Sequence, residues 1–252
     1  MRENLLRKIW AEGRTAINGW LTIPSTFCAE TMAHQDWDSL VVDMQHGVVD
    51  YLAAVDMLTA ISTTDTVPLV RVPWREPGIL MKALDAGAYG VICPMINNAR
   101  ECEELVSWTS YPPRGTRSNG PIRANLYAGS DYQANANETI VRFAMIETAE
   151  ALDNIDDIMS VPGLDAVYIG PSDLSLALGC RPLFDELDPP AAEAVELILA
   201  KAKEHGLRAG MHNMTGEYAQ KRIEMGFDLV TIGSDARLMA NAATNQIAIA
   251  RQ

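Results

Sequence analysis

The sequence has no long apolar run, few cysteines and no secretion signal. No segment reaches the ~18 apolar residues of a membrane-spanning helix, and residues 1–13 lack the apolar centre of a signal peptide. Cys28, Cys93, Cys102 and Cys180 show neither CxxC nor metal-type spacing, so we expect free thiols in a reducing compartment. These absences favour a cytoplasmic protein that does not associate with a membrane.

Positive charge is also scarce. The chain has 20 Lys and Arg residues against 33 Asp and Glu residues, a net charge of −13, which argues against nucleic acid or an anionic membrane as a partner. Neither GxGxxG nor GxxxxGK[ST] occurs, so NAD and P-loop nucleotide sites are not expected. The segments after the last two predicted strands lack a glycine cluster that could hold phosphate. We therefore expect an unphosphorylated carboxylate as the substrate.

Lysine is absent from every predicted strand end. All the lysines lie in predicted helices. Lys8 lies in residues 1–13, where charged and apolar residues alternate at helical spacing, and the others are Lys82, Lys201, Lys203 and Lys221. A Schiff-base mechanism needs a lysine amine in the site, and so does a PLP enzyme, so the sequence predicts neither.

Short apolar runs rich in β-branched residues alternate with segments of helical periodicity, which predicts one (β/α)8 (TIM) barrel over residues 1–252. The predicted strands are 16–23, 39–44, 67–72, 90–95, 142–148, 166–171, 207–212 and 229–234. The predicted helices are 51–61, 76–86, 98–108, 149–159, 191–204, 215–225 and one after residue 235. The Pro-, Gly- and Asn-rich segment 110–140 is expected to be a long loop, either functional or disordered.

Two acidic residues lie where adjacent strands end, Glu147 at the end of the fifth and Asp173 at the end of the sixth. In such barrels the reactive groups project from the C-terminal ends of the strands. With no Cys or His beside them, the two carboxylates suggest a hard-oxygen site for Mg²⁺ or Mn²⁺ that leaves positions open for substrate. The alternative is that each acid only caps a helix or lies in its first turn.

The second strand ends in Asp43, Gln45 and His46, and the third carries Arg71. An imidazole suits a general base near neutral pH, and a guanidinium suits a carboxylate or enolate oxygen. The alternatives are that His46 caps the helix after Asp50 and that Arg71 forms a structural salt bridge with Asp43. His212 is expected only to shape the pocket.

Seven ordered motifs are similar to those of the HpcH/HpaI family of class II pyruvate aldolases, and the resemblance extends over residues 4–245. They are "DSLVVDMQHG", "PLVRVPW", "LDAGAYGVICPM", "YPPRGTR", "IETAEAL", "YIGPSDLSLALG" and "DLVTIGSD". The resemblance implies reversible cleavage of a 4-hydroxy-2-oxo acid to pyruvate or hydroxypyruvate plus an aldehyde, as in aromatic compound catabolism. It also implies a homohexamer, built as a trimer of dimers, with the C-terminal helix packed on a neighbouring subunit.

Carried over to this sequence, the resemblance implies a role for each of several residues. Glu147 and Asp173 would hold Mg²⁺, Mn²⁺ or Co²⁺. The predicted catalytic residues are His46, Arg71, Asp43 and Asp85, of which Asp85 would support the histidine from a neighbouring subunit. Arg71, Gly170, Ser172 and Asp173 would contact the substrate.

Two positions depart from the family pattern. Gln45 replaces a common glutamate, and Met145 replaces a glutamine that often contacts the substrate. A thioether cannot make the hydrogen bonds of an amide, so Met145 could favour donors such as hydroxypyruvate. Three alternatives stay open: a citrate-lyase-β or malyl-CoA-lyase type enzyme, a non-catalytic protein that binds metal and oxo acids, and a metal-dependent isomerase or epimerase.

Overall fold

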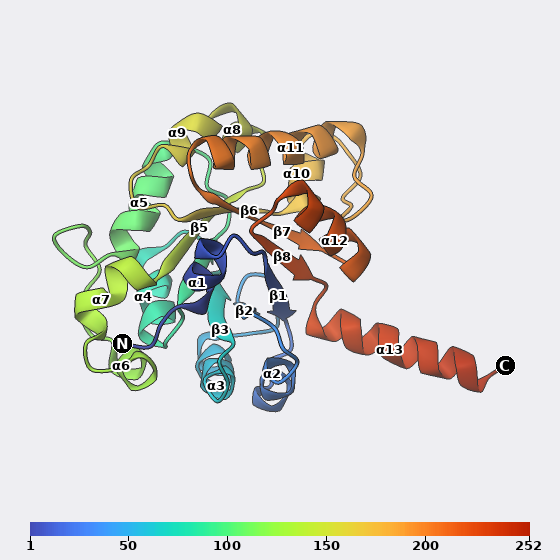
Figure 1. Cartoon of the computed structure of the whole chain (residues 1–252), viewed down its shortest axis with the longest axis horizontal. Coiled ribbons are helices and arrows are strands. Elements are labelled where there is room, and N and C mark those ends of the chain that lie inside the picture. Colours follow the sequence, from blue (N-terminus) through green and yellow to red (C-terminus); the bar gives the residue numbers. More distant parts are fainter.

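Eight parallel strands close into one barrel in the computed structural model, which describes residues 1–252 (Figure 1). Each strand pairs with the next one in sequence, and β8 closes the barrel against β1 with Ala16 opposite Leu229. The predicted (β/α)8 barrel and all eight predicted strands are confirmed. The strands are β1 (Ala16–Leu21), β2 (Ser39–Asp43), β3 (Val67–Arg71), β4 (Gly90–Cys93), β5 (Val141–Ile146), β6 (Ala166–Ile169), β7 (Arg208–Asn213) and β8 (Leu229–Ile232).

Helices surround the barrel and match the predicted periodic segments, except that 149–159 forms two helices that meet at Asn154. The short helix α2 was not predicted, and α10 was considered only in the alternative that places Asp173 in the first turn of a helix. None of the helices combines the length and the hydrophobicity that crossing a membrane requires. They are α1 (Leu5–Ala11), α2 (Thr26–Ala33), α3 (Tyr51–Ile61), α4 (Pro77–Asp85), α5 (Ala99–Thr109), α6 (Ile122–Ala128), α7 (Tyr132–Thr139), α8 (Ala149–Asp153), α9 (Ile155–Met159), α10 (Pro171–Ala177), α11 (Pro189–Glu204), α12 (Gly216–Met225) and α13 (Asp235–Ala250).

The strands are apolar along their length because both of their faces are covered. Every residue of β2 and β5 is buried, between the barrel interior and the surrounding helices. Cys93 and Cys102 are buried free thiols, and burial raises the pKa of Cys102 to about 12. These thiols are therefore packing residues that stay protonated near neutral pH.

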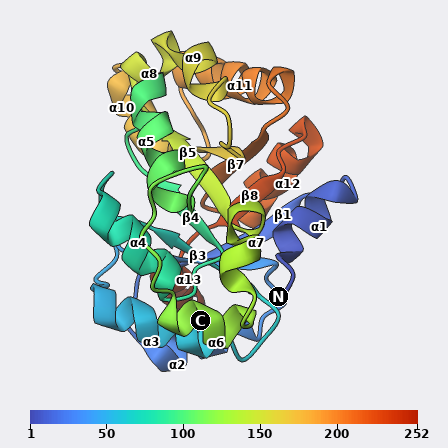
Figure 2. The same ribbon diagram turned by 90° about the vertical axis from the view of Figure 1, so that its left-hand side faces the viewer.

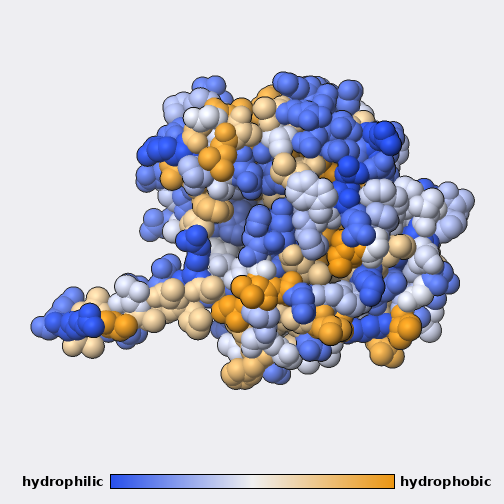
Figure 3. All heavy atoms as spheres, turned by 180° about the vertical axis from the view of Figure 1, so that it is seen from behind, coloured by the Kyte–Doolittle hydropathy of each residue, from blue (hydrophilic) through white to orange (hydrophobic).

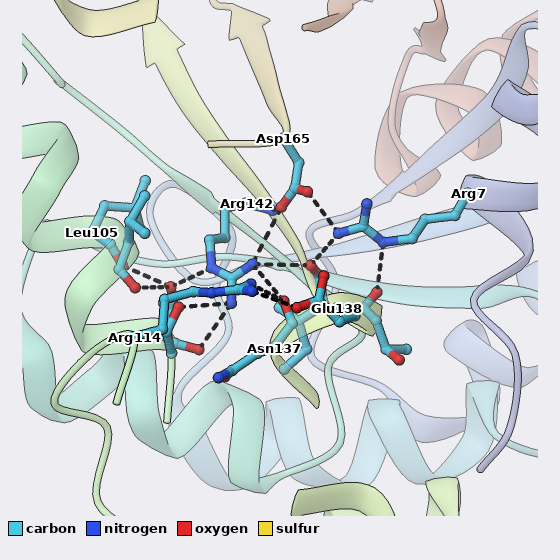
Figure 4. Close-up of polar contacts among 12 residues, drawn as sticks. Arg7, Leu105, Arg114, Asn137, Glu138, Arg142 and Asp165 are labelled. Carbon is cyan, nitrogen blue, oxygen red and sulfur yellow. Dashed lines mark hydrogen bonds and ion pairs between the residues drawn. The ribbon is translucent and has the colours of Figure 1, made fainter. Parts of the chain in front are cut away.

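Buried charges at the N-terminal ends of the strands are held by a network of polar contacts (Figure 4). Arg142, which is 1% exposed, donates to Thr109 Oγ1 and Ser110 Oγ at 2.9 Å each, and it pairs with Asp165. Asp165 also accepts a hydrogen bond from Arg7 at 2.6 Å. Because this network lies at the end of the barrel away from the C-terminal ends of the strands, we assign it to stability.

The prediction for residues 110–140 is wrong in part, because this segment contains α6 and α7. Arg117 has a fully buried side chain that donates to Asp85 and to Tyr132. Arg123 donates to Ala86 O at the end of α4 and to Thr59 in α3. Figure 2 shows α6 lying beside α3 and α4. The arginines thus fix the segment to the barrel wall, with no part of it in the central cavity described below.

Candidate active site

A cavity of about 350 Å³ lies at the C-terminal ends of the strands. We call it the central cavity. Its lining includes five residues predicted from the sequence, His46, Arg71, Gly170, Ser172 and Asp173. In Figure 1, α1 lies in the foreground, over the N-terminal ends of the strands. Figure 3 shows the molecule from behind, so it faces the C-terminal ends of the strands, where the cavity lies.

Arg71 is held rigidly by Asp43. Its Nε donates to Asp43 Oδ1 at 2.8 Å and its Nη2 to Oδ2 at 2.6 Å, while its guanidinium carbon lies 4.8 Å from the centre of the Trp20 ring. Asp43 is 1% exposed. Burial favours its neutral form, but the hydrogen bonds and charge of Arg71 outweigh burial and hold the pKa of Asp43 below its usual value. The salt bridge considered from the sequence is therefore present, and Arg71 Nη1 has no protein partner.

His46 lies in the segment after β2, on the edge of the cavity. Its backbone N–H donates to Asp43 Oδ1 at 3.3 Å, whereas its ring makes no hydrogen bond within the chain. The alternative that His46 caps the next helix is wrong, because the side chain of Asp50 caps α3 by accepting from Ala53 N–H. The imidazole is thus free to contact a substrate.

Glu147 directly follows β5 and is 2% exposed, with one hydrogen bond, from Met95 N–H at 2.9 Å. Burial raises its pKa to about 7; the Met95 N–H opposes this shift, and the charge of Asp173 adds to it. Glu147 is not a helix cap, since Thr148 caps α8. Asp173 lies in the first turn of α10, which was the alternative to a metal site considered from the sequence. It also lines the cavity, however, and its side chain has no hydrogen-bond partner.

These carboxylates fit a divalent cation. Glu147 is buried without a cationic partner, and it is close enough to Asp173 for the two negative charges to repel each other. A Cβ at Gly170 would come 2.3 Å from Glu147 Oε2, so only glycine leaves the space beside this oxygen unfilled. The structure contains no cluster of three or more His, Cys, Asp or Glu residues suited to a metal. Two protein oxygens plus substrate and water oxygens match the preference of Mg²⁺.

Asp85 does not reach the central cavity of its own chain. It is the last residue of α4, and its Oδ1 accepts from Arg117 Nη2 at 2.7 Å. A helix that follows a strand in this barrel runs back toward the N-terminal ends of the strands. A catalytic role for Asp85 therefore requires a second copy of the chain.

Several cavity residues were missed by sequence reasoning, whereas His212 lines the cavity, as expected. The His212 ring lies 5.0 Å from Trp20 and 5.5 Å from Phe184, measured between ring centres. Burial, with the nearby charge of Arg71, lowers the pKa of His212 to about 3, so this imidazole is neutral. Trp20 lies inside a strand, and the sequence around an aromatic residue in a strand does not indicate whether the side chain lines a cavity or packs in the core. The missed residues are Trp20, Thr22, Tyr168, Pro171, Phe184 and Arg237.

The sequence profile described as HpcH/HpaI aldolase/citrate lyase matches residues 18–242. The chain belongs to this family. It is 45% identical to a hydroxypyruvate/pyruvate aldolase of Rhizorhabdus wittichii, over 98% of this chain and 99% of that protein. A 4-hydroxy-2-oxo-heptane-1,7-dioate aldolase of Escherichia coli is 32% identical, over 96% of this chain and 92% of that protein. The crystal structure of an HpcH/HpaI aldolase/citrate lyase family protein from Burkholderia cenocepacia superposes with a TM-score of 0.92, at 28% identity, covering both chains completely.

Proposed function

We propose that this protein is a divalent-metal-dependent aldolase that reversibly cleaves a 4-hydroxy-2-oxo acid into an aldehyde and pyruvate or hydroxypyruvate. The observation that carries the proposal is a pair of neighbouring carboxylates. Asp173 lines the cavity together with Arg71 and His46, and Glu147 lies directly behind Gly170 of the same lining. No lysine lines the cavity, so covalent activation of the carbonyl has no amine. The family and its aldolase relatives support an enzyme of this class.

The roles of the residues follow from their contacts. Held by Glu147 and Asp173, Mg²⁺, Mn²⁺ or Co²⁺ would supply a Lewis acid that stabilises negative charge on the 2-oxo oxygen. Arg71 Nη1 is free to donate to that oxygen, because Asp43 already occupies Nε and Nη2. Asp43 thereby acts as a positioning residue. His46, whose ring has no partner, would move the proton between substrate and solvent.

The donor end of the substrate is assigned to the turn before α10. Gly170 and Ser172 line the cavity beside Glu147 and would contact the substrate carboxylate. Met145 is 1% exposed, and its Cε would be 2.9 Å from a Cβ at Gly170, so it lies against the same turn. This position, and the name of the relative from Rhizorhabdus wittichii, support hydroxypyruvate beside pyruvate as the donor.

A matrix of 2-oxo acids and aldehydes, run with Mg²⁺, Mn²⁺ and Co²⁺, tests the proposal. We expect aldol turnover with pyruvate or hydroxypyruvate that is lost in EDTA and restored by adding metal, because the charge on the 2-oxo oxygen needs a cation. Full activity in EDTA would contradict the proposal. An acyl-CoA substrate in the same matrix tests citrate-lyase activity, and release of aldehyde excludes an isomerase or epimerase.

A His46→Ala variant serves as the matched comparison in that matrix. It should slow proton transfer by about 100-fold or more, while metal binding measured by calorimetry stays unchanged. If metal affinity fell as much as turnover in this variant, His46 would instead belong to the metal site.

We further propose that the protein forms a homo-oligomer through α13, consistent with a hexamer built as a trimer of dimers. This helix projects away from the barrel in Figure 1, and only its first residue, Asp235, is buried. Met239, Ile247 and Ile249 are exposed on it, and Figure 3 shows further apolar atoms on the barrel beside its base. Because an isolated helix of 16 residues is marginally stable, a second copy is the natural cover.

Light scattering coupled to size exclusion tests this assembly. The full chain should elute as an oligomer at micromolar concentration, and a chain ending at residue 240 should dissociate. A monomeric full chain would contradict both the assembly and a role for Asp85 in a neighbouring site.

We also place the reaction in the cytoplasm, in the breakdown of aromatic compounds. The free thiols support a reducing compartment.

A further inference from the structure

Arg237 is an arginine without a partner at the edge of the central cavity. It is the third residue of α13 and lines the cavity. Apart from Arg251, at the C-terminal end of the same helix, every other arginine donates a hydrogen bond or forms an ion pair. In a chain with 33 acidic residues, a cavity arginine that pairs with none of them is available to a ligand.

The acidic residue nearest to Arg237 in sequence does not neutralise it. Asp235 lies in the same helical turn and is 3% exposed. Its Oδ1 accepts from the backbone N–H and the hydroxyl of Thr22, and its Oδ2 accepts from Ile23 N–H. This carboxylate ties the start of α13 to the segment after β1, so it positions Arg237 without pairing with it.

The other charges of the cavity are already balanced. Asp43 binds Arg71 in a bidentate salt bridge, and the proposed divalent cation would balance Glu147 and Asp173. His212, between these groups and Arg237, is uncharged because burial lowers its pKa to about 3. Among the protein groups that line the cavity, Arg237 is therefore the positive charge that neither a protein carboxylate nor the proposed metal site balances.

Its position identifies the part of the substrate that it would meet. Glu147 and Asp173 follow β5 and β6, whereas Arg237 follows β8, on the far side of β7. The donor 2-oxo acid is assigned to the β5–β6 side, so the aldehyde-derived half extends toward β7 and β8. The rings of Phe184 and His212 lie on this path, 5.5 Å apart between centres, and can cover the carbon chain of an acceptor.

We propose that Arg237 binds a carboxylate at the far end of the aldehyde-derived half of the substrate, so that the acceptor is an aldehyde with an anionic end. This inference rests on the proposed aldolase function. A guanidinium is permanently charged and presents paired N–H donors that match a carboxylate. The aromatic wall holds the carbons between the reacting carbonyl and that carboxylate.

Two aldehydes of equal length test the inference, succinic semialdehyde, which ends in a carboxylate, and butanal, which does not. With pyruvate and Mg²⁺, the intact protein should give the higher kcat/KM with succinic semialdehyde. Arg237→Gln should lower that value by about 10- to 100-fold, mainly through KM, because a charge-assisted hydrogen bond is lost. The kcat/KM for butanal should change by less than about twofold. Arg237→Lys should keep part of the preference for succinic semialdehyde over butanal.

Arg251→Gln is the matched control, since it removes the same charge from the other end of α13 and should alter neither aldehyde. Exchange of the pyruvate methyl protons with D₂O, followed by NMR, needs no aldehyde. No exchange in the intact protein would reject the proposed aldolase function itself. If exchange persists but Arg237→Gln changes kcat/KM equally for both aldehydes, or for neither, only the role of Arg237 is overturned. A changed oligomeric state in that variant, with equal losses on both aldehydes, would assign Arg237 to subunit packing.

Discussion

Replacing Glu147 with glutamine is expected to lower aldol turnover by about 1,000-fold or more, because it removes one of two protein ligands for the cation that stabilises the developing charge. Glutamine keeps the size of the side chain and can still accept the hydrogen bond from Met95 N–H. Activity in the metal-supplemented donor and aldehyde assay gives the first measurement. Calorimetric titration with Mn²⁺ gives the second, and should show affinity weakened by at least about 10-fold.

Glu150→Gln provides the matched control. Glu150 lies three residues further on, in the first turn of α8, and is exposed. The same chemical change there should leave both turnover and Mn²⁺ affinity within about twofold of the unmodified protein, as is usual for an exposed site. Equal turnover in Glu147→Gln and the intact protein would remove Glu147 from the metal site.

The raised pKa of Glu147 adds a pH signature. Burial raises this pKa from its usual 4.5 to about 7, so without metal the folded state binds more protons than the unfolded state between these pH values. The free energy of unfolding contributed by this group should therefore fall by about 3 kcal/mol as pH rises from 4.5 to 7. Chemical denaturation of the metal-free protein at pH 5 and pH 8 measures it, and Glu147→Gln should lack this component. Since a cation competes with the proton, metal affinity should weaken as pH falls below 7.

The barrel was predictable because its signal is local. Runs such as residues 40–42 are apolar at every position, which a strand covered on both faces requires. In six of the eight strands a polar residue ends the run, or closely follows it, where the cavity begins. Asp43, Glu147 and Asp173 were found in this way, because the C-terminal ends of parallel strands meet at one end of a barrel.

The parts that were not predicted depend on contacts between distant segments. Arg117 is in a segment rich in Pro, Gly and Asn, and nothing in that composition indicates its buried contacts with Asp85 and Tyr132. Phe184 reaches the cavity from the connection between α10 and α11, and its ring against His212 has no periodic signature. Asp85 is a different case, because its assignment comes from a resemblance and concerns the site of a neighbouring subunit.

Replacing Arg71 with methionine is expected to damage both catalysis and stability. Turnover should fall by about 100- to 1,000-fold, because the free Nη1 donor and the positive charge at the 2-oxo oxygen are lost. The free energy of unfolding should fall by about 3–5 kcal/mol, because the variant leaves Asp43, 1% exposed, as a buried carboxylate without its cation. Turnover is measured in the donor and aldehyde assay, and stability by chemical denaturation.

Arg75→Met is the control for the loss of an arginine salt bridge. Arg75 pairs with Glu101 and Glu104, all three side chains are at least 20% exposed, and none lines the central cavity. This variant should lose only about 1 kcal/mol and keep its turnover. A loss as large as that of Arg71→Met would show that burial of Asp43 is not the cause of the instability.

A second substitution separates the two roles of Arg71. In the Arg71→Met background, Asp43→Asn removes the stranded charge while its amide still accepts from Trp20 Nε1 or a backbone N–H. Most of the lost unfolding free energy should return, but turnover should stay at the level of the single variant. If turnover also recovered, the charge of Asp43 rather than the donor on Arg71 would control the reaction. Asp43 would then be an inhibitor that Arg71 neutralises, and the stabilisation of the 2-oxo oxygen would have to come from the cation at Glu147 and Asp173 alone.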